Sequence, residues 1–235
     1  LDAVDIDGAV QIDATLSVGV DDTGYDVKFF GATASAYMLW DQSADDLILG
    51  GAAGLVVNGE ISTTSAGTSN FRAGVNAGNS IVSGGVQNVV VGDEAGTAIT
   101  TGDNNVAVGY TSLTANTTGA SNVAVGANAL DANTTASNNV GIGLNAAGGT
   151  TTGANNIAIG TNSLLTNTTG ASNVSIGTYA LNANTTAANN TAVGTSALTA
   201  NTTGTRNTAV GALAGDANTE GNYNSAFGYN SLGAN

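Results

Sequence analysis

The chain has 235 residues, with 17 acidic and three basic side chains, a formal net charge of −14, and no proline, cysteine or histidine. This charge balance argues against a nucleic-acid partner and against attraction to anionic membranes, both of which require clusters of basic residues. Without histidine or cysteine the chain lacks the usual residues of catalytic triads and zinc sites, and no apolar run is long enough to span a membrane. We therefore expect a non-enzymatic protein without cofactor, metal or membrane insertion.

In residues 1–20 the large apolar residues from Val4 to Val20 fall on even positions, and Asp5, Asp7, Asp13 and Ser17 fall on odd ones. This alternation predicts one long strand, or two strands broken near Gly8, with one face buried. Eleven of the 17 acidic residues lie in residues 1–60, and we expect most of them on solvated strand faces and turns. Asp5-Ile6-Asp7-Gly8 resembles the start of a calcium loop, but it lacks the further carboxylates that such a loop needs. Whether the acidic residues bind calcium stays open.

Residues 20–62 contain short apolar runs between turns, namely Tyr25–Phe30, Tyr37–Trp40, Leu47–Leu49 and Leu55–Val57. The Asn58-Gly59 pair that follows is a strong hairpin signal. We predict an N-terminal β-meander module over residues 1–62 with its aromatic residues in the core; a sugar-binding aromatic platform is the alternative.

Residues 63–86 form a transition. Asn70 and Gly74 keep the four-residue spacing that recurs later in the chain, 18 residues before Gly92. Because terminal repeats are usually atypical, we predict a degenerate capping repeat here.

Residues 87–235 hold nine copies of a 17-residue repeat, which indicates a repeat architecture. A glycine recurs every 17 residues, at Gly92, Gly109, Gly126, Gly143, Gly160, Gly177, Gly194, Gly211 and Gly228. An asparagine lies four positions before each of them, at Asn88, Asn105, Asn122, Asn139, Asn156, Asn173, Asn190, Asn207 and Asn224.

Most copies contain a β-branched pair flanking a small residue, as in Val106-Ala107-Val108, and this alternation predicts a short strand. The glycine then allows a bend, a leucine such as Leu113 follows, and an Asn-Thr-Thr stretch supplies turn chemistry. Since such a sequence is a poor helix, we predict a parallel β-solenoid with one coil per repeat. Nine coils at the strand spacing of about 4.8 Å give a rod roughly 43 Å long, with the asparagines stacked as a ladder and the glycines at the coil turns.

The β-branched pair and the leucine are expected to face the interior of the coil, so Val108→Asp is expected to bury a charge. The alanine between them is then expected to face outward, where a column of small residues permits close approach by another chain. We expect an oligomer on this ground; the alternative is that the alanines are simply exposed. They are Ala107, Ala124, Ala158, Ala192, Ala209 and Ala226.

Two resemblances follow from these motifs. Asn-Val-Ala-Val-Gly and Asn156–Gly160 are similar to the head repeats of YadA-like trimeric autotransporter adhesins, which are left-handed parallel β-rolls assembled as trimers. The fuller pattern Asn-Thr-Thr-Gly-x-x-Asn-x-Ala-Val-Gly, together with the Val20–Leu49 stretch, resembles tail-fibre and related structural proteins of bacteriophages. These resemblances imply a homotrimeric virion fibre whose partners are its own copies, other virion structural proteins and a host cell-surface receptor.

Two further functions stay open. One is the head of a bacterial surface adhesin, and the other is an ice-binding solenoid with stacked threonines. Adjacent threonines such as Thr117-Thr118 are predicted to point to opposite faces of a strand, which weakens the second. The Asn-Thr-Thr stretches also match the N-glycosylation acceptor pattern, which we attribute to turn composition. We expect the natural chain to extend before Leu1, and to continue beyond Asn235 or to be cut there.

Overall fold

A computed structural model describes residues 27–30, 37–41, 46–50 and 69–233. The described residues form strands and turns without a helix, so the all-β prediction is confirmed. The chain divides into two compact units, Leu1–Ile61 and Ser62–Asn235, which are described separately below.

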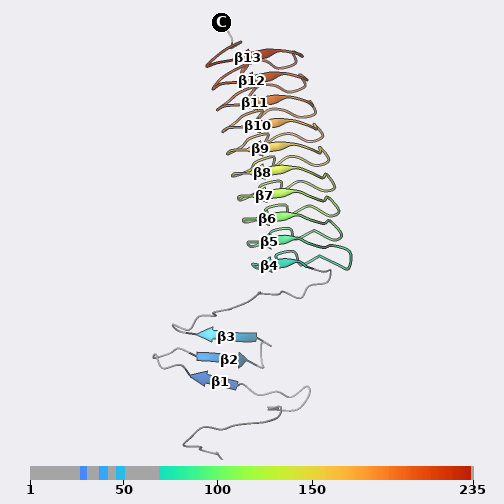
Figure 1. Cartoon of the computed structure of the whole chain (residues 1–235), viewed down its shortest axis with the longest axis vertical. Coiled ribbons are helices and arrows are strands. Elements are labelled where there is room, and N and C mark those ends of the chain that lie inside the picture. The colour runs from blue at the N-terminus through green and yellow to red at the C-terminus, as the bar shows by residue number, and fades with distance from the viewer. Residues whose placement is uncertain (1–26, 31–36, 42–45, 51–68, 234–235) are drawn as a thin grey trace, which may run out of the picture. The chain divides into compact units, whose positions relative to one another are not determined.

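The described part of the first unit is an antiparallel sheet of three strands in the order β1-β2-β3 (Figure 1). These strands are β1 (Val27–Phe30), β2 (Tyr37–Asp41) and β3 (Asp46–Gly50). They coincide with three of the apolar runs expected to form the meander. The strand expected in residues 1–20, the Asp5–Gly8 segment and the Asn58-Gly59 hairpin lie outside the described residues.

The second unit is a parallel β-solenoid, as predicted from the repeat (Figure 1). Ten three-residue strands form one sheet in sequence order, and each strand pairs with the next in parallel. In register, Val106 lies beside Val123 and Phe71 lies beside Val89. The strands are β4 (Phe71–Ala73), β5 (Val89–Val91), β6 (Val106–Val108), β7 (Val123–Val125), β8 (Val140–Ile142), β9 (Ile157–Ile159), β10 (Val174–Ile176), β11 (Thr191–Val193), β12 (Thr208–Val210) and β13 (Ser225–Phe227).

Backbone hydrogen bonds between coils continue well beyond the short strands. Leu113 N–H donates to the Ala129 carbonyl at 2.9 Å, and Thr117 N–H donates to the Thr134 carbonyl at 2.8 Å. The pattern is repeated in the following coils, so the backbone of each coil is tied to its neighbour on several sides. This arrangement satisfies backbone groups that three-residue strands alone would leave unpaired.

The prediction of which strand residues face the interior was wrong. The middle residue of each strand faces the interior, and Ala107, Ala124 and Ala158 have no exposed surface. The flanking valines and isoleucines point outward and are half-buried or exposed. The coil is too narrow for the predicted arrangement because it already contains a leucine and two asparagine columns. Even a Cβ added at Gly141, in the alanine column, would lie 3.0 Å from Leu130 Cγ.

Two interior columns compensate each other in size. In most coils a leucine is followed three residues later by a small polar residue, as in Leu113 and Asn116, both fully buried. An earlier coil has Gly96 and Ile99 at these two places, and a Cβ on the glycine would lie 2.8 Å from the isoleucine Cδ1. The isoleucine therefore fills the space that the missing leucine leaves, which keeps the interior closely packed.

The recurring glycine is required by both conformation and space. Gly109 has φ of 132°, a region that side chains rarely adopt. A Cβ at this position would lie 2.7 Å from the carbonyl carbon of Gly126 in the next coil. The glycine column therefore allows the backbones of successive coils to approach each other at the turn after each strand.

Candidate functional site

The nine predicted asparagines line the interior of the solenoid as one column. Asn88 to Asn207 are buried, and Asn224 is half-buried. Asn122 represents the group: its Oδ1 accepts the Asn139 N–H at 2.9 Å, and its Nδ2 donates to the Ala136 carbonyl at 2.9 Å. A longer contact of 3.2 Å joins its Nδ2 to Asn105 Oδ1. The side chains thus bond mainly to backbone groups, whereas the sequence predicted amide-to-amide stacking above and below.

A second interior asparagine column was missed at the sequence level. It consists of the first residue of each Asn-Thr-Thr stretch and of the equivalent Asn218 in Asn218-Thr219-Glu220, and its members are Asn116, Asn133, Asn167, Asn184, Asn201 and Asn218. Here the amides do stack, since Asn133 Nδ2 donates to Asn116 Oδ1 at 2.9 Å. The Gly119 carbonyl receives Nδ2 from both columns, Asn105 and Asn116, each at 2.9 Å. The fixed 17-residue spacing of these asparagines is the sequence feature from which this column could have been predicted.

The second column also bears on the N-glycosylation pattern. The acceptor asparagines Asn116 and Asn133 have no exposed surface. Thr150 interrupts the column, and Asn133 Oδ1 is left buried without a hydrogen-bond partner. In the folded solenoid these amides form part of the core and are not accessible to a modifying enzyme.

The outward-facing strand residues form an uncharged strip along the solenoid that is apolar from β4 to β10 and includes polar members in β11 to β13; we call it the outer strip. It consists of the first and third residues of β4–β13, and from β5 to β10 every member is valine or isoleucine. No member is charged. The members are Phe71, Ala73, Val89, Val91, Val106, Val108, Val123, Val125, Val140, Ile142, Ile157, Ile159, Val174, Ile176, Thr191, Val193, Thr208, Val210, Ser225 and Phe227.

The outer strip remains substantially accessible in the single chain. Ile157 and Ile176 are each 36% exposed, and Phe227 is 67% exposed. With strands about 4.8 Å apart and a width of roughly 10 Å, the strip covers about 400 Å². A patch of this area is as large as the largest apolar patch of a typical monomer, which is often functional. The outer strip therefore takes the place of the alanine column as the candidate contact surface between chains.

The two threonines of each Asn-Thr-Thr stretch have different environments. The first, as in Thr117, donates its hydroxyl to a carbonyl of the next coil, Thr134 O, at 3.1 Å. The second, as in Thr118, is exposed, and its hydroxyl has no hydrogen-bond partner among the described residues. The solenoid thus presents a single regular column of free threonine hydroxyls on its surface.

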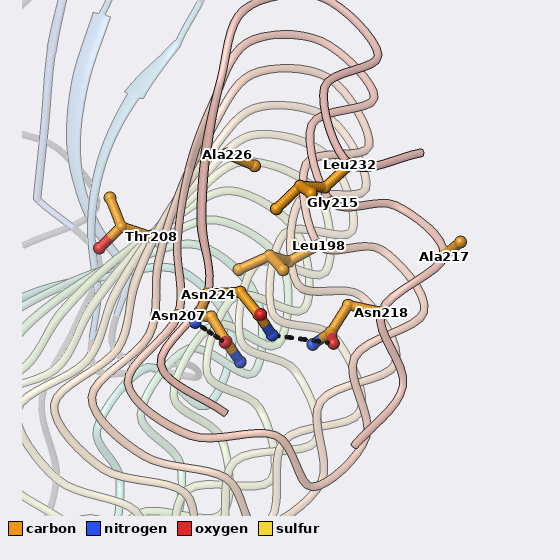
Figure 2. Close-up of a pocket in the computed structure, with 9 residues that line it drawn as sticks. All are labelled: Leu198, Asn207, Thr208, Gly215, Ala217, Asn218, Asn224, Ala226 and Leu232. Atoms are coloured by element: carbon orange, nitrogen blue, oxygen red, sulfur yellow. Dashed lines mark hydrogen bonds between the residues drawn. The ribbon is translucent and has the colours of Figure 1, made fainter. Parts of the chain in front are cut away.

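A partly open pocket of about 240 Å³ lies at the last two described coils, and Leu232, which lines it, is 59% exposed (Figure 2). Gly215 occupies the leucine column there, between Leu198 and Leu232. Three residues later stands Asn218, where the earlier coil with a glycine in this column has Ile99. The leucine is therefore missing without the compensation seen at Ile99. Asn224 closes one side, with its N–H on Asn207 Oδ1 at 2.9 Å and its Nδ2 on Asn218 Oδ1 at 3.3 Å. We assign this pocket to imperfect core packing.

Ionisable groups are sparse in the described solenoid. Partial burial raises the pKa of the Asp131 carboxyl above its usual value, and the backbone N–H groups of Asp131 and Ala132 partly offset this effect. No group of three or more acidic, histidine or cysteine side chains is positioned to hold a metal ion within the described ranges. The same ranges contain no helix of the length and hydrophobicity needed to cross a membrane.

Comparison with known proteins gave no match: no family model, no curated protein and no solved structure is significantly similar to the chain.

Proposed function

We propose that this chain is the shaft of a bacteriophage tail or head fibre, a homotrimer that holds a receptor-binding tip away from the virion. The observation that carries the proposal is the outer strip, an uncharged surface that follows the described stack and is apolar except at Thr191, Thr208 and Ser225. A surface of this kind suits lengthwise association of identical rods, because most coils contribute the same contact. The sequence resemblance to phage fibres and trimeric adhesin heads supports three copies in an extracellular particle.

The energetics support association through the strip. Removing about 400 Å² of apolar surface from water is worth roughly 10 kcal/mol per chain. That value is comparable with the estimated 4–15 kcal/mol that association costs. In a trimer each outer strip would contact the strips of two other chains, one on each side. In a dimer it would contact the strip of one other chain only. Other virion proteins would hold the base of the fibre, and its role is structural rather than catalytic.

The interior supports a mechanical role. Two buried asparagine columns and the backbone bonds join each coil to the next, so bending or separating coils breaks several hydrogen bonds at once. A rod with this connectivity resists bending and keeps its two ends at a fixed separation. That property is required of a shaft that carries a tip.

Two other functions fit the same architecture. The head of a bacterial surface adhesin would be attached to a bacterial cell, whereas a fibre shaft is attached to a virion. The site of attachment therefore decides between adhesin and phage fibre. The column of free hydroxyls that includes Thr118 favours ice binding as a second candidate. A thermal hysteresis assay tests it, and an absence of hysteresis would remove it.

The proposal is tested by the native mass of the chain, measured by light scattering and compared with 22.7 kDa for one copy. We expect a trimer for the natural sequence and for Thr118→Asp, which places a charge away from the outer strip. We expect Val108→Asp/Val125→Asp to be a folded monomer, because both charges would lie in the contact. A monomeric natural chain would refute the trimeric shaft, and a trimeric double variant would refute the outer strip as its interface.

A further inference from the structure

One exposed edge of the solenoid changes its chemistry in the last two coils. Arg206 and Tyr223 occupy a column that holds asparagine or serine in the six preceding coils. Glu220 occupies the column of exposed threonines that ends at Thr203. Neither column contributes to the core, so packing gives no reason for these departures from the repeat. Together with Asn222 we call these residues the tyrosine patch.

The exposure of the patch follows from its position on the coil. All members of both columns are exposed from the coil of Thr101 and Asn104 onward. Tyr223 is 70% exposed, although Arg206 lies beside it in the preceding coil. The residues are therefore presented to solvent by the same geometry that exposes the threonines along the rest of the rod.

Arg206 contacts the tyrosine ring and restricts its orientation. Arg206 Nη1 donates to the Tyr223 hydroxyl at 2.7 Å, and the guanidinium carbon lies 5.3 Å from the ring centroid. Asn222 Oδ1 accepts the Thr205 N–H at 2.6 Å and the Thr205 hydroxyl at 2.8 Å, which fixes the adjacent amide. A ring and an amide that are ordered before binding lose little conformational entropy when a ligand arrives.

Three polar groups close to Tyr223 in the sequence or in the adjacent coil remain free to bind. The Glu220 carboxylate, the Asn222 Nδ2 group and the Thr203 hydroxyl have no hydrogen-bond partner among the described residues. Arg206 uses one nitrogen on Tyr223, which leaves further N–H donors. The patch thus combines one apolar ring face with a carboxylate, an amide, a hydroxyl and a guanidinium group on a rigid backbone.

We propose that the tyrosine patch binds a hexose unit of a cell-surface polysaccharide. The C–H face of the sugar would stack on the open side of Tyr223, since a tyrosine ring is apolar over its body and polar at its tip. Neighbouring hydroxyls would donate to Glu220 and accept from Asn222 or Arg206. One acid beside one base favours a neutral sugar over a polyanion.

A sugar fits this surface better than a protein does. A stable protein interface needs about 800 Å² per partner around an apolar centre. The tyrosine patch has a single ring among threonine, asparagine and glycine neighbours. The proposal rests on the proposed function, in which the fibre meets a cell surface, and it adds a receptor-contacting site to the side of the shaft.

The test uses the full chain on a printed array of bacterial surface polysaccharides and neutral hexose oligosaccharides. Any array hit is followed by NMR titration with the corresponding oligosaccharide. We expect at least one hexose-containing glycan to bind, and we expect Tyr223→Ala to weaken binding at least tenfold. Tyr179→Ala removes an exposed tyrosine elsewhere on the rod and is expected to bind as the natural chain does.

Failure of this proposal is distinguishable from failure of the shaft. The native mass is measured on the same samples, and all three proteins are expected to be trimers. A trimer that binds no glycan on the array would overturn the sugar site and leave the shaft standing. Unchanged binding by Tyr223→Ala would show that any glycan site lies elsewhere. Arg206→Lys provides a milder variant, expected to weaken binding less than Tyr223→Ala does.

Discussion

The interior asparagine column makes a quantitative prediction for Asn122→Ala. Asn122 is fully buried and makes hydrogen bonds of 2.9, 2.9 and 3.2 Å. Its loss leaves the Asn139 N–H without an acceptor, which costs roughly 1–3 kcal/mol, and each lost bond contributes about 1 kcal/mol. The Ala136 carbonyl keeps Asn133 Nδ2 at 3.1 Å. We therefore expect the free energy of unfolding to fall by about 3–4 kcal/mol.

The assay is urea denaturation followed by circular dichroism at one protein concentration, because association changes apparent stability. Thr118→Ala is the matched control: the residue is exposed, its hydroxyl is free of protein partners, and a change within about 0.5 kcal/mol is expected. Asn122→Asp tests the donor role, since a carboxylate cannot donate to the Ala136 carbonyl. A loss below 1 kcal/mol for Asn122→Ala, or an Asp variant as stable as the natural chain, would refute the ladder as a source of stability.

Three further substitutions probe the turn, a buried charge and the pocket. Gly126→Ala is expected to lower the free energy of unfolding by more than about 3 kcal/mol in denaturant titration, because φ is 128° and the new Cβ would lie 2.6 Å from Gly143 O; a loss under 1 kcal/mol would contradict the tight turn. The raised pKa of Asp131 means that the folded state favours the protonated form, so its contribution is favourable in acid and is lost as pH rises through the folded-state pKa. Asp131→Asn should therefore be more stable than the natural chain at neutral pH, with a difference that shrinks in acid; a pH-independent difference in melting temperature would count against this account. Gly215 has φ of 60°, close to the φ of 49° that Leu198 adopts in the same column, although a Cβ at Gly215 would lie 3.0 Å from Leu198 Cδ2. If Leu198 shifts slightly, Gly215→Leu should raise stability by about 1–2 kcal/mol by filling the pocket beside it, and an unchanged denaturation midpoint would show that the pocket does not accept the side chain.

The repeat period was sufficient to predict the stack. When residues 17 positions apart are of one type, parallel pairing in register brings like side chains together, as Val106 and Val123 show. The direction in which the strands face was not predictable from the strand pattern alone. A large-small-large triplet fits either orientation, and the choice depends on how much interior space the other columns leave.

The second asparagine column explains the error. The sequence predicts a turn at Asn116, because asparagine and threonine side chains hydrogen-bond to nearby backbone in turns. Its burial alongside Asn105 and Leu113 fills the interior, which leaves room for alanine but not for a pair of valines. The tyrosine patch could be suspected from sequence as a departure from the repeat, but the contact between Arg206 and Tyr223 becomes visible only when the coils are stacked.

The in-register pairing has a consequence for length. Each strand pairs only with those of the coils directly before and after it, through bonds that recur from coil to coil. Duplicating or deleting a whole 17-residue unit in the middle of the array would leave every remaining junction of the same kind. Such a change would lengthen or shorten the solenoid by about 4.8 Å per unit. An insertion or deletion of another size would have to be absorbed within one coil, as happens in the first coil, where Phe71 pairs with Val89 across 18 residues. The length of the solenoid can therefore change in steps of one repeat, while the contacts between the remaining coils stay the same.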